Sequence, residues 1–468
     1  MLPSVAELVA RFLRTNGYTE TLKSFVKEAG LPSDTGAGSN STVTIESILH
    51  EKKTFDLSLN FEKLGVEDGK CEWTVPAPSK PTVLASLPSR SNILSVAAFK
   101  LQLPSSSGVR QYVAVSTADR RLHLLDPGSP SFELVHSYTA FQDSPILDIL
   151  TIGSRYIMIA SMSGKLLLYD TVSDQILDER KDHSKYIVRI VCWPDGDSIL
   201  VASAGWDSKV FLYRIPTGGD TPLIGEPLST LTLTSIPETL LFVRSPESGS
   251  PILLVARRDS TFLYYYSIPQ VIDSAFELLG KQNLAPHSNA WVAFTPADVR
   301  ICPTDPSVVA VATSSTPHMK ILILKLLLPP TRAAEPCETA EAEATEPVAL
   351  TQASQARAEL LIANREEAAI LINVSTMAPQ TAYSTPRLSW RPDGTGLYVS
   401  SDDGVVRGVE ANSGKLIASM EGHEPGSKLR CLWAGTLETR GSEANGSTGA
   451  REVLISGGFD QRLVLWDC

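Results

Sequence analysis

Strand pairs joined by a tight turn recur along most of this 468-residue chain, and this repeat restricts the fold more than any other feature. The turn residues Asp119, Ser163 and Asp207 lie 44 residues apart. Similar strand pairs surround four later turns, at Asp259, His318, Asp403 and Asp460. A period of about 40–45 residues is typical of a four-stranded propeller blade, which buries its faces only by stacking on other blades. We therefore predict an all-β, seven-bladed β-propeller over residues 80–468, with eight blades as the alternative count.

The last repeat needs a strand from elsewhere in the chain. Residues 453–467 supply inner strands of the final blade, and only two residues follow Trp466. We expect a strand at about residues 81–87 to pair with this blade and close the ring, because an unpaired sheet edge invites aggregation.

Two repeats carry residues that resemble the WD40 family. In the last repeat the matching residues are Gly422, His423, Ser456, Asp460 and Trp466. In the third repeat they are His183, Ser203, Asp207 and Tyr213, with Tyr in place of Trp. The resemblance implies a structural hydrogen-bonded tetrad in each blade.

The same resemblance implies which positions line the face where peptides dock. In WD40 proteins these are the residue before the tetrad Asp and the residue at the start of the first strand. The matching positions, which we predict to bind partners, are Tyr186 and Trp206 in the third repeat and Lys428 and Phe459 in the last. Exposed aromatic side chains often dominate the binding energy of an interface.

The first 32 residues have the pattern of two short amphipathic helices. Ser4 and Glu7 have the spacing of a capping box, and Asn16-Gly17 is typical of a helix end. Thr19 is placed to cap the second helix, which ends at Gly30. Two helices this short need another surface to cover their apolar faces, so the length alone indicates a partner.

This helical hairpin resembles the LisH motif. The matching residues are Leu8, Phe12, Leu13, Gly17, Tyr18, Thr21, Phe25, Glu28 and Ala29. The resemblance implies that these residues form a homodimerisation element, a small four-helix arrangement of two chains. The alternative is an ordinary hairpin that packs against the rest of its own chain.

Two further stretches lie outside the repeat. Residues 33–79 combine a Ser/Gly/Thr-rich segment with helical spacing, and we interpret them as a linker with helical segments. Residues 329–357 are rich in Pro, Ala and Glu, which predicts a flexible acidic insertion between the fifth and sixth repeats. The residues from 359 to 374 have no obvious place in a blade.

The composition excludes several classes of function. The chain has 52 Asp+Glu against 41 Lys+Arg, a formal net charge of −11, and no basic run that would bind nucleic acid directly. It shows neither a secretory signal nor a membrane-spanning apolar stretch. The six cysteines are scattered, so we expect no zinc site and no disulfide framework. These features favour a protein of the cytoplasm, the nucleus or both.

We predict no catalytic residues, metal or cofactor. His423, Ser456 and Asp460 are the residue types of a hydrolase triad, but their spacing is that of a structural tetrad. An enzymatic propeller, a hydrolase or lactonase, is the alternative of another class and needs ionisable side chains converging on the axis. The first strands offer Asp148 and Arg189 but no evident convergent set.

The combined pattern predicts a non-enzymatic scaffold that dimerises through the hairpin and presents the propeller to protein partners. Proteins that combine the two modules are found in ubiquitin-ligase assemblies, transcriptional corepressor complexes and microtubule-motor regulation. The architecture slightly favours a ubiquitin-ligase or other multisubunit complex.

Overall fold

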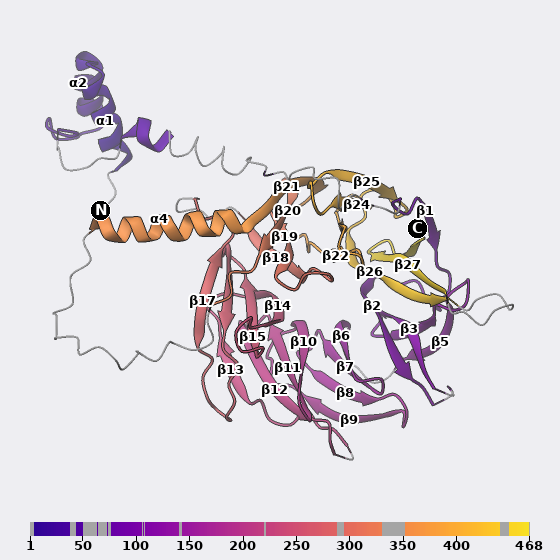
Figure 1. Cartoon of the computed structure of the whole chain (residues 1–468). Helices are drawn as coiled ribbons and strands as arrows, with labels where there is room; N and C mark the ends of the chain where they lie inside the picture. The colour runs from indigo at the N-terminus through magenta and orange to yellow at the C-terminus, as the bar shows by residue number, and fades with distance from the viewer. Residues whose placement is uncertain are drawn as a thin grey trace. The chain divides into compact units, whose positions relative to one another are not determined.

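The computed structural model describes residues 4–37, 44–49, 63, 73, 76–104, 106, 108–139, 143–219, 221–287, 294–329, 352–439 and 449–467. The chain forms two compact units (Figure 1). One unit comprises Met1–Phe61 and His287–Trp291, and the other comprises Glu62–Pro286 and Val292–Cys468.

The first unit contains the helical hairpin, α1 (Val5–Thr15) and α2 (Thr19–Glu28). The Ser4 hydroxyl accepts from the Glu7 amide, and the Glu7 carboxylate accepts from the Ser4 amide, so the predicted capping box is present. Thr19 does not cap α2, because it is already the first residue of that helix: the tight turn at Gly17, at φ +74°, leaves three residues, Asn16, Gly17 and Tyr18, between the helices. Tyr18 is the N-cap residue and makes no side-chain capping bond.

The second unit is the propeller, made of seven four-stranded antiparallel sheets (Figure 1). Blades one to four contain β2 (Ile93–Gln102), β3 (Val109–Thr117), β4 (Leu122–Asp126), β5 (Glu133–Tyr138), β6 (Ile146–Ile152), β7 (Tyr156–Ser161), β8 (Leu166–Asp170), β9 (Gln175–Arg180), β10 (Ile187–Asp195), β11 (Ser198–Gly205), β12 (Lys209–Pro216), β13 (Ser229–Thr232), β14 (Pro237–Arg244), β15 (Pro251–Arg257), β16 (Phe262–Tyr266) and β17 (Leu278–Asn283). Blades five to seven contain β18 (Thr295–Ile301), β19 (Val308–Ser314), β20 (His318–Lys325), β21 (Ile370–Pro379), β22 (Leu388–Trp390), β23 (Gly396–Val399), β24 (Val405–Glu410), β25 (Leu416–Glu421), β26 (Leu429–Thr439), β27 (Gly449–Gly458), β28 (Leu463–Asp467) and β1 (Lys80–Val83). The predicted count of seven is confirmed.

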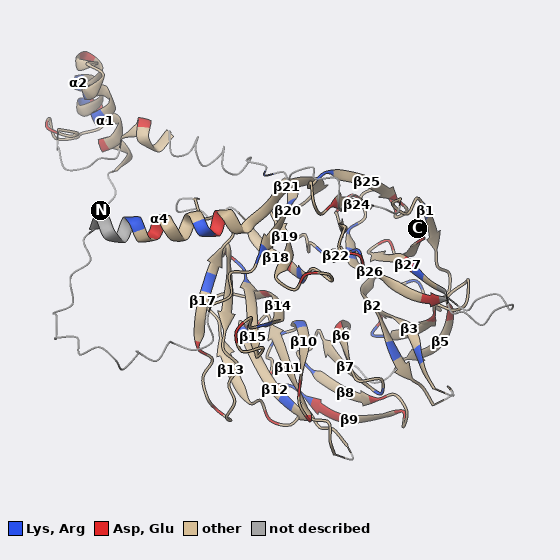
Figure 2. Cartoon of the chain, in the orientation of Figure 1, with Lys and Arg blue, Asp and Glu red and all other residues tan. Residues whose placement is uncertain are grey.

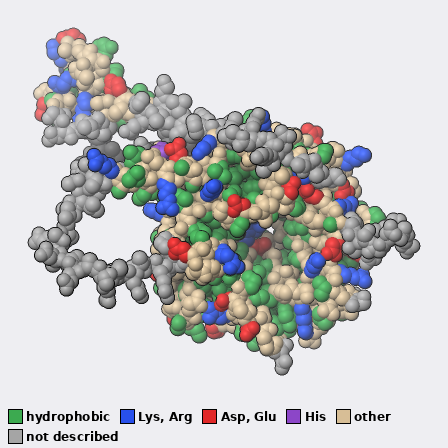
Figure 3. All heavy atoms as spheres, viewed as in Figure 1, with side chains coloured by type: hydrophobic (Ala, Val, Ile, Leu, Met, Phe, Trp, Pro, Cys, Tyr) green, Lys and Arg blue, Asp and Glu red, His purple; other side chains and the backbone are tan. Residues whose placement is uncertain are grey.

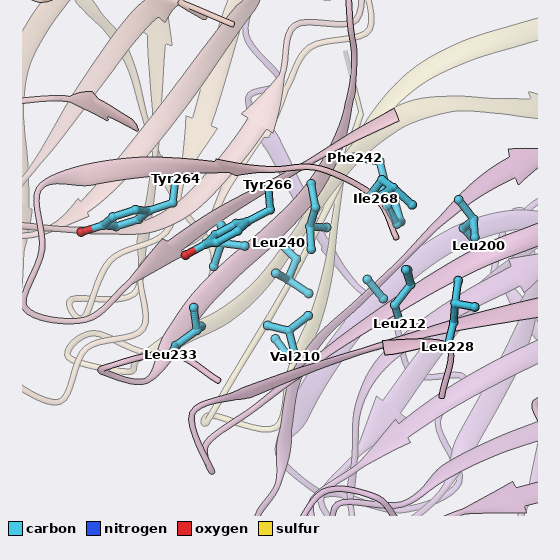
Figure 4. Packing of buried hydrophobic residues seen from close by; sticks show 14 residues of the cluster. Leu200, Val210, Leu212, Leu228, Leu233, Leu240, Phe242, Tyr264, Tyr266 and Ile268 are labelled. Carbon is cyan, nitrogen blue, oxygen red and sulfur yellow. The ribbon is translucent and has the colours of Figure 1, made fainter. Parts of the chain in front are cut away.

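The apolar side chains of each blade divide between two neighbours. Along β11, Leu200, Ala202 and Ala204 pack toward blade four, whereas Val201 packs toward blade two. Figure 4 shows the first of these interfaces, where leucines of blade three meet Leu240 and Phe242 of β14. Successive side chains on a strand point to opposite faces, so a strand buried on both faces needs an unbroken apolar run. This requirement explains the apolar runs in the sequence.

The ring closes where β1 pairs with β28. Lys80 pairs with Asp467 and Val83 with Val464, so the strand nearest the N-terminal side of the propeller becomes the outer strand of the last blade. The expected closure therefore occurs, through a shorter strand than residues 81–87. Charged residues lie on loops, on outer strands such as β9 and along the inserted helix α4 (Gln352–Ala369) (Figure 2).

The segment before β1 also contacts the propeller at two points. Lys63 forms an antiparallel bridge with Asn373 of β21. The Trp73 ring covers Gly396 and Gly408, where a Cβ atom would come within 2.5 Å of the indole. The compact propeller unit thus extends back to Glu62, into the stretch interpreted from sequence as linker.

The insertion after β20 lies within blade five, not between the fifth and sixth repeats as predicted. The chain continues through α4 into β21, which pairs with β20 in the same sheet, with Ile321 opposite Val374. The otherwise unassigned residues 359–374 thus form the end of a helix and the outer strand of blade five. Most of the predicted acidic insertion, residues 330–351, lies outside the described residues, and residues 352–357 belong to α4.

We expect Trp466→Ala to destabilise the propeller by about 3–5 kcal/mol, as is typical when a large buried aromatic is removed. Trp466 is fully buried in β28, next to the closing strand, and its ring lies against Gly422. Urea unfolding followed by circular dichroism measures the change. Phe459→Ala, at an exposed position of the same blade, is the control, and equal unfolding midpoints for the two variants would contradict the prediction.

Candidate interaction site

The last blade contains a complete chain of side-chain hydrogen bonds. His423 Nδ1 lies 2.9 Å from Asp460 Oδ2, and His423 Nε2 lies 2.7 Å from the Ser456 hydroxyl. Trp466 Nε1 donates to the same hydroxyl at 2.8 Å. Burial alone would raise the pKa of Asp460, but hydrogen bonds from His423 and from backbone amides hold it below its usual value. Because Ser456 is fully buried, this arrangement holds strands together and offers no accessible nucleophile.

The third blade has the same core with a different fourth member. His183 lies 3.0 Å from Asp207 and 2.9 Å from Ser203, and burial lowers the pKa of His183. The hydroxyl of Tyr213 donates to Asp182 at 3.0 Å. Tyrosine at the Trp position thus extends the network to the residue before the histidine.

Tyr186 and Trp206 form an aromatic pair on blade three. Their ring centroids lie 4.7 Å apart, and the Trp206 amide donates to the Tyr186 carbonyl. The Arg258 guanidinium, from blade four, lies 5.2 Å from the Trp206 ring. Burial raises the pKa of Tyr186 to about 12. Both residues are half-buried, so part of this aromatic pair reaches solvent.

Lys428 and Phe459 adjoin each other on blade seven. The Phe459 amide donates to the Lys428 carbonyl, and the Phe459 side chain is 46 % exposed. Lys428 Nζ lies 3.1 Å from Asp402. The four residues predicted from the resemblance thus form two local pairs on separate blades.

The central channel contains more charged side chains than Asp148 and Arg189, the two that the sequence analysis named. Six of the seven first strands show a register irregularity near their start, directly after the first paired residue in five of them and after the second in β18. The charged residues of this set lie in the first strands of the blades or, for Arg387, directly before one: Asp148, Arg189, Glu238, Asp298, Arg300, Arg387 and Arg430. A β-bulge redirects side chains, which is why strand alternation alone does not identify these residues. The expectation that no convergent charged set exists is therefore wrong.

Asp298 is the centre of this set. It is fully buried, and Arg189 Nη2 lies 2.8 Å and Arg300 Nε 3.2 Å from its carboxylate. Burial alone would raise the pKa of Asp298, but Arg300, Arg189 and Arg387 hold it below the usual value. The set is rich in guanidinium groups, and its aspartates are engaged in ion pairs. The described residues include no group of three or more His, Cys, Asp or Glu placed to hold a metal ion.

None of the helices in the described residues is long and apolar enough to cross a membrane.

The fold defines a β-propeller protein with an N-terminal LisH-type hairpin, and the comparisons with known proteins agree. The family model described as the UCP007778 beta-propeller domain matches residues 103–432, and that for the UCP007778 LisH domain matches residues 4–33. The chain therefore belongs to the UCP007778 family. The crystal structure of Saccharomyces cerevisiae Sqt1 has a similar fold, with a TM-score of 0.51 and 14 % identity, covering 84 % of this chain and 100 % of that chain. No curated protein matches the chain.

Asp298→Asn should destabilise the propeller at pH 7 by about 3–5 kcal/mol, since it leaves buried arginines without their counter-charge. A carboxyl group whose pKa is lower in the folded than in the unfolded state stabilises the fold at pH values above its unfolded pKa. This stabilisation is lost as the pH falls through the folded pKa. The difference from the wild type should therefore shrink below about pH 4. Urea unfolding at pH 7 and pH 3 measures it, with Asp143→Asn at an exposed ion pair as control. A difference that does not depend on pH would contradict this account.

Proposed function

We propose that this protein is a non-enzymatic scaffold that dimerises through its LisH-type hairpin and presents its propeller to protein partners. The observation that carries the proposal is the pairing of an incompletely buried helical hairpin with a closed propeller in one chain. Linking two recognition domains raises the effective concentration at a partner with more than one binding site.

The helical hairpin supports dimerisation because it leaves its apolar residues partly uncovered. Among the apolar side chains of α1 and α2, only Ala10 and Leu22 are buried. Leu8, Phe12 and Leu13 on α1 and Phe25 on α2 remain partly exposed. A second copy of the hairpin would bury them, and the other residues of the LisH match, Gly17, Tyr18, Thr21 and Glu28, would lie at or beside that contact.

The propeller supports protein binding through the two residue pairs described above. Trp206 with Tyr186, and Phe459 with Lys428, each combine an aromatic ring with a nearby cation or hydroxyl. Interfaces often concentrate their binding energy in such aromatic residues. A subunit of a ubiquitin-ligase or other multisubunit complex in the cytoplasm or nucleus is the assembly we favour, with a corepressor or motor-regulatory scaffold as the alternatives.

Replacing both Leu13 and Phe25 with Asp should convert a dimer into a monomer while the propeller stays folded, because charges cannot be buried at an apolar contact. Analytical ultracentrifugation of the full chain measures the mass. Lys23→Asp, at an exposed position of α2, is the matched control. A double variant with the mass of the wild type would refute dimerisation through this hairpin.

Trp206→Ala should weaken partner binding by about 2 kcal/mol or more, the usual cost of losing an interface hot spot. Quantitative mass spectrometry of proteins that copurify with tagged full-length chain compares the variant with the wild type. Trp206→Phe, which preserves the stack on Tyr186, should retain most of the binding. Thermal unfolding of both variants separates lost recognition from lost structure. If Trp206→Ala retains every partner, Trp206 is not the anchor.

A further inference from the structure

The walls of the central channel carry an excess of positive charge. Four guanidinium groups line the cavity at the centre of the blades, those of Arg189, Arg300, Arg387 and Arg430, against the single lining carboxylate of Asp148. Asp298, buried behind this wall, adds one more negative charge. Two positive charges therefore remain uncompensated, in a protein whose formal net charge is −11.

The few carboxylates of the channel are already occupied. Asp298 is shared by Arg189 and Arg300, and Arg387 Nη1 lies 4.0 Å from it, too far for a hydrogen bond. Asp148 accepts from two backbone amides, those of Ile149 and Ile190. Glu238, the remaining carboxylate near this level, is paired with Arg258 at 2.6 Å.

Arg387 and Arg430 therefore keep donors that other side chains do not use. Within the described part of the chain, the Arg430 side chain has no hydrogen bond or ion pair. Burial and the neighbouring arginines lower the pKa of Arg387 to about 10, and burial lowers the pKa of Arg430. Crowded like charges of this kind destabilise the channel, and a bound anion would relieve the repulsion.

The cavity has the size of a small-molecule site. Its volume is about 400 Å³, within the usual range for ligand pockets, and its hollow is visible at the centre of the blades in Figure 3. Trp390 and Trp433 add aromatic surface to the wall. The lining residues come from blades one, two, three, five, six and seven, so the complete cavity exists only when the ring is closed.

From the cavity, its four arginines and their shortage of carboxylates, we propose that the central channel binds a small polyvalent anion carrying phosphate groups. The planar guanidinium fork matches phosphate oxygens bidentately, and several forks around one cavity suit a ligand with several charged oxygens. This site lies beyond the scaffold function, which does not require it.

The test is isothermal titration calorimetry of the full-length protein with tripolyphosphate at low ionic strength. We expect a saturable site whose affinity falls as salt is added. Arg430→Gln should weaken binding at least tenfold, and Arg387→Gln with Arg430→Gln should weaken it further. Arg462→Gln, at a surface ion pair with Glu424, is the matched control and should bind like the wild type.

Thermal unfolding distinguishes a ligand-binding role of Arg430 from a structural one. Without anion, Arg430→Gln should be at least as stable as the wild type, because it removes an unpaired like charge. With saturating tripolyphosphate the order should reverse, since only the wild type gains the full stabilisation of a bound ligand.

Two results would overturn the proposal. One is the absence of tripolyphosphate binding at low salt, and the other is equal affinity of the Arg430→Gln and Arg462→Gln variants. If tripolyphosphate does not bind and a hexaglutamate peptide does, the channel is instead a site for an acidic segment of a protein. Each result is independent of whether the hairpin dimerises.

Discussion

Mutual burial of neighbouring blades is the interaction on which the rest of this structure depends. Each sheet presents apolar side chains on both faces, and each face is covered only by the next sheet. The side chains of β11 show this dependence, because alternate residues belong to the cores shared with blade four and with blade two. These cores are shared between blades, so each blade depends on its neighbours for the burial of its apolar side chains.

Closure of the ring also creates the charged channel. The first strand of each blade brings at most a few charged residues to the axis, and any one of these strands alone suggests only a surface charge. Arg189 and Asp298 are 109 residues apart in sequence and 2.8 Å apart in the folded chain. Apolar packing between blades supplies the stability that allows so many arginines to lie close together.

The repeat period, the resemblance to two families and the helix-capping pattern were sufficient to predict the seven blades, the hairpin and the pairing of the two propeller ends. Other features depend on contacts that the sequence does not display. The outer strand of blade five, β21, is separated from β20 by α4 and the residues that precede α4. The spacing between these two strands therefore does not follow the repeat period of the other blades. Tyr213 donates a hydrogen bond to Asp182, because the hydroxyl of a tyrosine lies further from the backbone than the indole N–H of a tryptophan. Arg189 and Arg430 lie at register irregularities, and only the closed ring brings the four channel arginines together.

The pairing of β1 with β28 has a consequence for synthesis of the protein. The ribosome makes β1 before the propeller's other strands and its partner last, with roughly 380 residues between them, which takes about 20–80 s at ordinary elongation rates. During this interval the nascent chain carries an open sheet edge and an unfinished ring. The growing polypeptide therefore has a long period in which a chaperone can engage it, and the propeller can close only after β28 has been made.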